Sequence, residues 1–158
     1  MMLSRKALPM LFTLVASLML VMATTARADT TLRINLRGDP AMLDPITYSE
    51  LMAGDVMKSV YEAFTNIDKD GNVIPGLATS WESHEDGLGW RFHLRKDVQF
   101  HSGRDFTAKD VKWTMEQLLT PGNKGGLNTR YLKNISGAQA VKDGATTDLV
   151  GVEIVDDH

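Results

Sequence analysis

The chain has 158 residues, and its 20 acidic side chains outnumber its 17 lysines and arginines. This acidic balance excludes a protein whose main partner is nucleic acid, because binding to phosphates needs a basic face. The sequence contains no cysteine, which excludes disulfide bonds, cysteine nucleophiles and a lipid anchor attached through cysteine.

Residues 1–28 have the three parts of a secretory signal peptide. Arg5 and Lys6 form a basic start, residues 7–23 are almost wholly apolar, and Ala26-Arg27-Ala28 provides the small residues of a cleavage site. The apolar part is short for a membrane-spanning helix, which needs about 20 residues. We predict cleavage after Ala28 and a mature protein that is free in the periplasm and not membrane-anchored.

The mature chain opens with a predicted strand. Leu32, Ile34 and Leu36 alternate with polar residues, which is the period of a strand with one apolar face. Turn signals follow at residues 38–40 and 43–45, each of which ends in proline.

A helix is predicted to begin after the second turn. Thr47 and Glu50 form the T-x-x-E pattern of a capping box, and Ile46 is placed to staple against Leu51. The next apolar residues recur at helical spacing and form one face: Ala53, Val56, Met57, Val60, Tyr61 and Phe64. This face predicts that the helix packs on another part of the fold.

Two hairpins are predicted next. Residues 68–71 form a turn between short strands, and residues 85–87 form a second turn. Apolar and polar residues then alternate in a strand that we expect to continue to Phe100. The alternation places three side chains inward: Trp90, Phe92 and Leu94.

The three tryptophans are expected in the core. Such a side chain serves either as a core anchor or as a platform for a ligand, and burial of an aromatic ring is a large stabilising contribution. We therefore favour core positions for Trp81, Trp90 and Trp113.

A second helix is predicted from the same kind of start signal as the first. Thr107 is the expected N-cap, Asp110 closes its capping box, and Phe106 is placed to staple against Val111. Pro121-Gly122 ends this helix.

The remainder of the chain has weaker patterns. Residues 121–129 are a loop rich in glycine and asparagine. Val152 and Ile154 alternate with other residues and predict a strand near the end of the chain.

One acidic turn resembles a calcium loop without completing it. Asp68, Asp70 and Asn72 stand at ligand positions. Val73, however, occupies the place of the required glycine, and Thr79 occupies the place of the closing glutamate. We therefore interpret these residues as a hairpin turn.

The sequence gives no support for a metal site, a catalytic site or a bound cofactor. His84, His93 and His101 are spaced 9 and 8 residues apart, which matches no zinc pattern. The G-x-S-x-G, H-E-x-x-H and phosphate-binding glycine patterns are absent from the sequence. A secreted enzyme stays open only as a second alternative.

Several blocks, in a fixed order, closely resemble family 5 of the extracellular solute-binding proteins. This family contains the dipeptide-, oligopeptide- and nickel-binding proteins of the periplasm. The blocks are residues 43–45 (LDP), 61–64 (YEAF) with 70–82 (DGNVIPGLATSWE), 90–103 (WRFHLRKDVQFHSG) and 106–111 (FTAKDV).

The resemblance implies an α/β fold (mixed α+β) like the type II periplasmic binding proteins, with two lobes hinged around the ligand. It places a strand and helix of the first lobe in residues 29–61 and a small accessory domain in residues 62–158, before the second lobe. Ligand sites of this kind bury most of the ligand surface. We therefore expect that residues 29–158 alone do not bind their solute.

The function that the resemblance implies is that of a receptor, not an enzyme. The protein would capture a small peptide or similar solute and deliver it to the membrane permease of an ABC importer. It would act as a monomer and without a cofactor. A receptor for nickel or another non-peptide solute, with the same fold, stays open as an alternative.

The resemblance also implies a ligand-binding segment. In relatives, the loop after the LDP block and the start of the next helix reach the cleft, and here these positions are Tyr48, Ser49, Glu50 and Leu51. A helix N-terminus offers free N–H groups and a positive dipole, and Glu50 adds a carboxylate suited to the ammonium end of a peptide. The alternative is that Glu50 only completes the capping box with Thr47.

Overall fold

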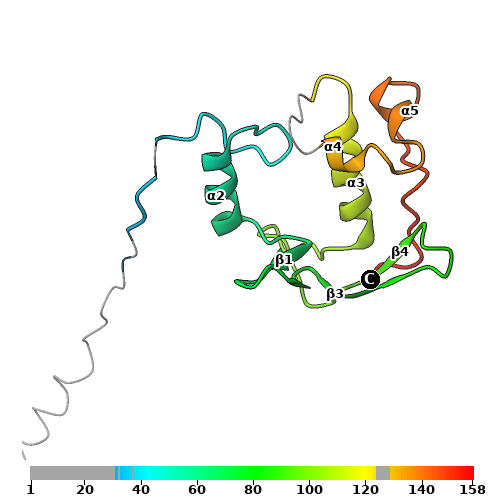
Figure 1. Cartoon of the computed structure of the whole chain (residues 1–158), viewed down its shortest axis with the longest axis horizontal. Coiled ribbons are helices and arrows are strands. Elements are labelled where there is room, and N and C mark those ends of the chain that lie inside the picture. The colour runs from blue at the N-terminus through cyan, green and yellow to red at the C-terminus, as the bar shows by residue number, and fades with distance from the viewer. Residues whose placement is uncertain (1–30, 32, 37, 124–128) are drawn as a thin grey trace, which may run out of the picture. The chain divides into compact units, whose positions relative to one another are not determined.

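The structure is a computed structural model of the whole chain, and it describes residues 31, 33–36, 38–123 and 129–158 (Figure 1). The predicted signal peptide and its cleavage site lie outside these residues. The described residues from Leu36 onward belong to one compact unit, and those before Leu36 lie outside it. Each helix in the described ranges falls short of the length and hydrophobicity that a membrane crossing requires.

The strand predicted from Leu32 to Leu36 is not formed. Thr31 and residues 33–36 belong to no strand, and Leu32 itself lies outside the described residues. Ile34, which lies on the apolar face of the predicted strand, is largely exposed. Alternation gives a segment one apolar face, but a strand also needs a neighbouring backbone to pair with. No strand in the described part of the chain pairs with this segment.

The first helix of the described unit, α2, spans Leu51–Val60 and begins later than its sequence pattern predicts. Its N-cap is Glu50, so Thr47 lies outside the helix and the predicted capping box is not formed. The predicted staple to Ile46 is also wrong, because the Leu51 side chain is 85% exposed.

The apolar face of α2 is shorter than predicted. Ala53 and Met57 are buried, whereas Val60 and Tyr61 are exposed. Tyr61 takes an extended conformation, with φ −109° and ψ 141°, and ends the helix. Phe64 is thereby carried out of the helix and into contact with the hairpins that follow.

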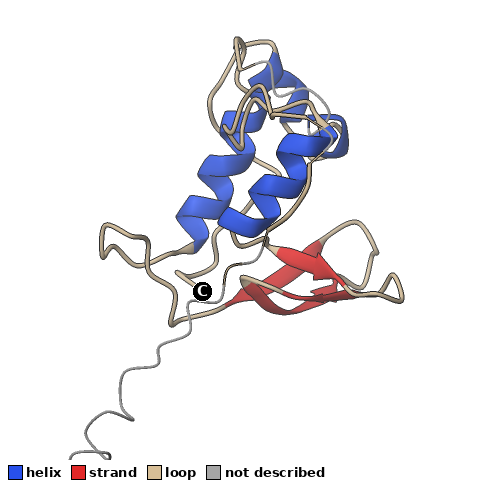
Figure 2. Cartoon of the chain, turned by 90° about the vertical axis from the view of Figure 1, so that its left-hand side faces the viewer, coloured by secondary structure: helices blue, strands red, loops and turns tan. Residues whose placement is uncertain are grey.

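Two antiparallel hairpins follow α2, each a separate two-stranded sheet. In the first, β1 (Thr65–Ile67) pairs with β2 (Val73–Pro75). In the second, β3 (Ala78–Ser83) pairs with β4 (Trp90–Leu94). Both turns lie where the sequence predicts them, and Figure 2 shows the strands lying to one side of the longer helices.

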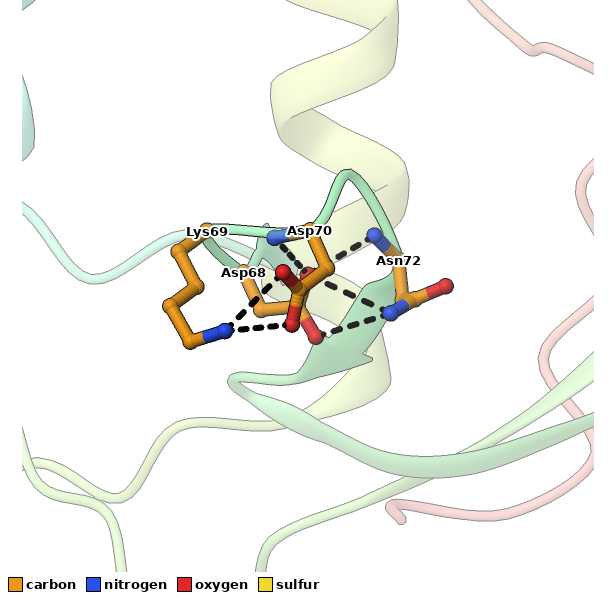
Figure 3. A network of polar contacts seen from close by, with 4 residues as sticks. All are labelled: Asp68, Lys69, Asp70 and Asn72. Atoms are coloured by element: carbon orange, nitrogen blue, oxygen red, sulfur yellow. Dashed lines mark hydrogen bonds and ion pairs between the residues drawn. The ribbon is translucent and has the colours of Figure 1, made fainter.

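The tip of the first hairpin is closed by one carboxylate (Figure 3). Asp68 Oδ1 accepts hydrogen bonds from the backbone N–H groups of Asp70 and Asn72 at 2.8 and 2.9 Å, and Oδ2 accepts one from the Asn72 amide at 3.0 Å. These bonds, first of all the one from the Asn72 side chain, lower the pKa of Asp68. Gly71 completes the turn with a φ of 88°, a conformation that favours glycine. The predicted hairpin turn is confirmed.

The inward face predicted for β4 is only partly correct. Leu94 is buried, but Phe92 is 38% exposed and Trp90 is 59% exposed. Phe92 packs against Phe64 with their ring centroids 4.8 Å apart. The strand ends at Leu94 and does not continue to Phe100. A two-stranded hairpin cannot bury its own face, so packing from other elements decides which of these residues are covered.

The prediction that all three tryptophans are core residues is wrong for two of them. Trp81 is half-buried, whereas Trp90 and Trp113 are more than half exposed. An aromatic ring becomes buried only where a second layer of structure covers the face that carries it, and sequence alone does not say where that layer lies.

Helix α3, Ala108–Leu119, begins and ends where the sequence predicts. Thr107 is its N-cap, and the Asp110 carboxylate accepts a hydrogen bond from the Thr107 N–H at 2.9 Å within the predicted capping box. Arg104 donates two further hydrogen bonds to Asp110, at 2.8 and 3.0 Å. These bonds from Arg104 are the main cause that lowers the pKa of Asp110.

The first apolar core lies between the second hairpin and the start of α3. Ala78, Leu94 and Phe106 are its buried centre. Partly buried side chains pack around this centre: Phe64, Leu77, Val98, Ala108 and Val111. Phe106 and Val111 therefore share one core, as the predicted staple requires.

A second core joins α3 to the last part of the chain, which contains the short helices α4 (Thr129–Leu132) and α5 (Ala138–Lys142). Four side chains form its buried centre: Leu119, Ala138, Val141 and Leu149. Two contacts from α3 hold the loop that carries Leu149. Lys112 pairs with Asp148 at 2.6 Å, and Glu116 Oε1 accepts a hydrogen bond from the Leu149 N–H at 3.1 Å.

The strand predicted at Val152 and Ile154 is not formed. Val152 instead packs against the second core. The chain then reaches β4, where the Leu94 N–H donates a hydrogen bond to the carbonyl oxygen of His158 at 2.6 Å. Val152 thus serves core packing and not a sheet, whereas Ile154 and Val155 are exposed.

Candidate functional site

The loop before α2 positions the four residues predicted to bind ligand. Asp44 organises this loop: its carbonyl oxygen accepts hydrogen bonds from the N–H groups of Thr47 and Tyr48, at 3.3 and 3.1 Å. Its carboxylate accepts one from the Ile46 N–H at 2.8 Å. The sequence analysis missed this role, although an aspartate that bonds to the backbone two residues later is a common turn signal.

Tyr48 lies across the first turns of α2. A methyl group at Gly54 would come within 3.4 Å of Tyr48 Cε2. The Tyr48 ring therefore rests on α2 at Gly54, a helix position without a side chain. Tyr48 is half-buried, while Ser49 is exposed. The aromatic ring therefore has one face against the helix, and its position is defined by the backbone of α2.

Glu50 is the N-cap of α2, and its side chain accepts no hydrogen bond from the N–H groups of the first turn. The Glu50 Oε2 atom is 3.4 Å from the Ala41 N–H, at the long limit of a hydrogen bond. Thr47 directs its hydroxyl to the Met42 sulfur at 2.7 Å. The alternative in which Glu50 only completes a capping box with Thr47 is therefore wrong.

The structure brings Tyr48, Ser49, Glu50 and Leu51 together at one helix end. Their carboxylate, hydroxyl and phenol groups stand beside backbone N–H groups that have no partner within the helix. Such a set can bind both an ammonium group and a carbonyl or carboxylate group, which are the polar ends of a peptide.

The described residues contain no group of three or more histidine, aspartate or glutamate side chains arranged to hold a metal ion. Of the histidines considered in the sequence, His93 lies 3.9 Å from Glu82 across the second hairpin. A contact at that distance between two exposed side chains is typical of a solvated sheet face.

The fold resembles solved structures of periplasmic peptide-binding proteins. The murein tripeptide-binding protein MppA in its unliganded open form superposes with a TM-score of 0.69 and 33% identity, covering 78% of this chain and 24% of MppA. The oligopeptide-binding protein OppA of Haemophilus influenzae, solved with the peptide RPPGFSPFR, gives a TM-score of 0.67 and 32% identity, covering 75% of this chain and 24% of OppA. The class defined by this fold is that of solute-binding proteins.

Residues 72–158 match the family profile described as bacterial extracellular solute-binding proteins, family 5 Middle. Among proteins of known function, the periplasmic murein peptide-binding protein MppA of Escherichia coli K12 is 32% identical over 126 residues, which cover 78% of this chain and 23% of MppA. The oligopeptide-binding protein OppA of Bacillus subtilis 168 is 31% identical over 133 residues, which cover 84% of this chain and 24% of OppA.

The chain belongs to family 5 of the bacterial extracellular solute-binding proteins. The predicted family and the predicted fold class are therefore confirmed. The chain spans about a quarter of the length of the relatives it matches. These relatives are named as binding proteins and not as enzymes.

Proposed function

We propose that this protein is a peptide receptor of an ABC importer. It binds a small peptide in the periplasm as a free monomer and delivers it to the membrane permease. The observation that carries the proposal is the match in sequence and fold to MppA and OppA, proteins named for murein peptides and oligopeptides. A division of the chain at residues 61 and 62, between a first lobe and an accessory domain, is part of the same proposal.

Within this function we assign ligand contacts to the N-terminal end of α2. The carboxylate of Glu50 pairs with the ammonium end of the peptide, and N–H groups of the first helical turn donate to a peptide carbonyl. Tyr48 supplies an aromatic surface whose position is set by Gly54. Ser49 and Leu51, both exposed, line the same helix end.

Substitution of Glu50→Gln is expected to weaken peptide binding by roughly tenfold to a hundredfold, because a hydrogen bond to a charged group contributes about 1.5–3 kcal/mol. The substitution removes the negative charge and keeps the size of the side chain. The measurement is calorimetric titration of the intact protein, and not of residues 29–158 alone, with mixed di- to pentapeptides and with the peptide RPPGFSPFR.

The matched control is Glu85→Gln, which removes an exposed carboxylate from the turn of the second hairpin. This variant is expected to bind peptide as the parent protein does. Equal affinities of the two variants would remove Glu50 from the site. Saturable binding of a non-peptide solute, with no binding of any peptide by the parent protein, would refute the peptide-receptor proposal itself.

We also propose that the protein reaches the periplasm through a cleaved signal peptide. The basic start, the apolar run and the small residues before Asp29 support this step. N-terminal sequencing of the protein from the periplasmic fraction is expected to begin at Asp29. Recovery from that fraction of a chain that still begins at Met1 would contradict the proposed cleavage.

A further inference from the structure

One arginine links the end of α2 to the second hairpin. Arg95 directly follows β4, and its Nη1 atom donates a hydrogen bond to Glu62 Oε1 at 2.6 Å. Its backbone N–H donates to the Leu77 carbonyl oxygen at 2.9 Å. Because Glu62 comes two residues after the last residue of α2, this contact joins the helix end to a strand end that lies 33 residues away in sequence.

The same junction is held by contacts around Glu62. The carbonyl oxygens of Ala63 and Phe64 accept hydrogen bonds from the N–H groups of Leu77 and Ala78, both at 2.9 Å. These contacts fix where the chain enters the hairpins. The direction in which α2 points away from them depends in addition on the two residues that separate the helix from Ala63, and Glu62 is the one of these that Arg95 holds.

Although Ala53 and Met57 are covered, α2 has little support from other helices and strands. Among the described residues, no other helix or strand packs extensively on α2. At its far end, the loop that carries Tyr48 lies against the helix, which is a contact between α2 and the segment directly before it. The contact at the near end therefore has a large influence on where the helix points.

Helix geometry amplifies any change at this junction. The ten residues of α2 span about 15 Å, so a tilt of about 10° at Glu62 displaces the N-terminal end by about 2.6 Å. A binding site keeps its affinity only when its groups are held to within about 0.5 Å. A small change of angle at the junction therefore displaces Tyr48–Leu51 by more than a binding site tolerates.

We propose that Arg95 is a positioning residue for ligand binding: through Glu62 it holds α2 at the angle that places Tyr48–Leu51 in the ligand cleft. The inference rests on the proposed function for its effect on affinity. Its structural part, that the Arg95–Glu62 pair sets the orientation of α2, stands without a ligand and is tested separately.

The chain offers a matched control for this pair. Arg95 also donates hydrogen bonds to Asp97, at 3.1 and 3.3 Å, and these bonds are the main cause that lowers the pKa of Asp97. Asp97 lies on the same segment as Arg95, two residues further on, so it does not connect to α2. Glu62→Gln and Asp97→Asn therefore each remove one carboxylate partner of Arg95, and only the first loosens the helix.

The ligand-independent measurement is a distance distribution in the intact protein. These 158 residues contain no cysteine, so within them Asp55→Cys, exposed on α2 and further from the junction, and Glu85→Cys on the second hairpin carry a unique pair of spin labels. Glu62→Gln is expected to broaden or shift the distance distribution between them, and Asp97→Asn is expected to leave it unchanged. Distributions that are the same in both variants and the parent would overturn the proposal, whether or not the protein binds peptide.

The second measurement is the affinity for RPPGFSPFR at a temperature where every variant is folded. Glu62→Gln is expected to weaken binding by up to about fivefold, the limit set by the strength of a partly exposed ion pair. Asp97→Asn is expected to keep the parent affinity, although it removes a comparable contact.

If Glu62→Gln shifts the distance distribution but leaves the affinity unchanged, the Arg95–Glu62 pair orients α2, and the proposed role of Arg95 in ligand binding is wrong. Absence of peptide binding by the parent would count against the proposed function, while the distance measurement still decides the junction.

Discussion

Substitution of Gly76→Ala is expected to destabilise the protein by about 3 kcal/mol, a cost typical of forcing an extra carbon into a closely packed site. A Cβ at this position would lie 2.3 Å from the carbonyl oxygen of Ala63 and 3.0 Å from that of Phe64. Both atoms belong to the backbone, so neither moves without breaking the hydrogen bonds they accept from Leu77 and Ala78. The measurement is the free energy of unfolding in urea, compared with the parent protein.

The control for this prediction is Gly38→Ala. A Cβ there would meet only the flexible side chain of Met52, at an ordinary contact distance of 3.6 Å. We expect its free energy of unfolding to stay within about 0.5 kcal/mol of the parent value. Similar effects of the two substitutions would show that the close approach at Gly76 is not what constrains the junction.

Substitution of Leu149→Ala is expected to lower the free energy of unfolding by about 2–5 kcal/mol, the range for removing a fully buried leucine side chain. Leu149 is 0% exposed and lies at the centre of the second core. The cavity is difficult to close because the backbone on both sides is held. The Leu149 N–H donates a hydrogen bond to Glu116, and the neighbouring Asp148 is paired with Lys112.

The matched variant is Leu88→Ala, which removes the same atoms from a side chain that is 89% exposed in the turn of the second hairpin. Its expected effect is within about 0.5 kcal/mol. The two variants are compared in one urea series. A loss at Leu88 as large as that at Leu149 would contradict the assignment of the second core.

The two predicted capping boxes show which local signals are sufficient. Thr107 and Asp110 form their box, and α3 begins where predicted. Thr47 and Glu50 have equivalent spacing, but the Asp44 carbonyl binds the Thr47 N–H in the preceding turn and α2 begins three residues later than a box at Thr47 would place it. A capping pattern is only a local preference. A neighbouring turn of similar strength competes for the same backbone groups, and here that turn moves the start of the helix.

Burial was the property that sequence patterns predicted least well. Leu94 and Trp90 share one face of a strand by alternation, yet Leu94 is buried and Trp90 is 59% exposed. The difference arises because Phe106, from a separate part of the chain, packs on Leu94. Periodicity tells which residues share a face, and only the packing of other elements tells how much of that face is covered.

The sequence by itself determined the family, the turns and the second helix, because these depend on short motifs in a fixed order, whereas the four residues of the candidate site stay a prediction from the family resemblance. The tertiary structure decided that α2 begins at Leu51, with no hydrogen bond from its first turn to the side chain of its N-cap Glu50, and that Glu62 and Arg95 join α2 to the second hairpin. Contacts of this kind form between segments far apart in sequence. Each side chain pairs with a charged or polar group on the other segment. Their pairing is a property of the folded chain as a whole, and no local pattern encodes it.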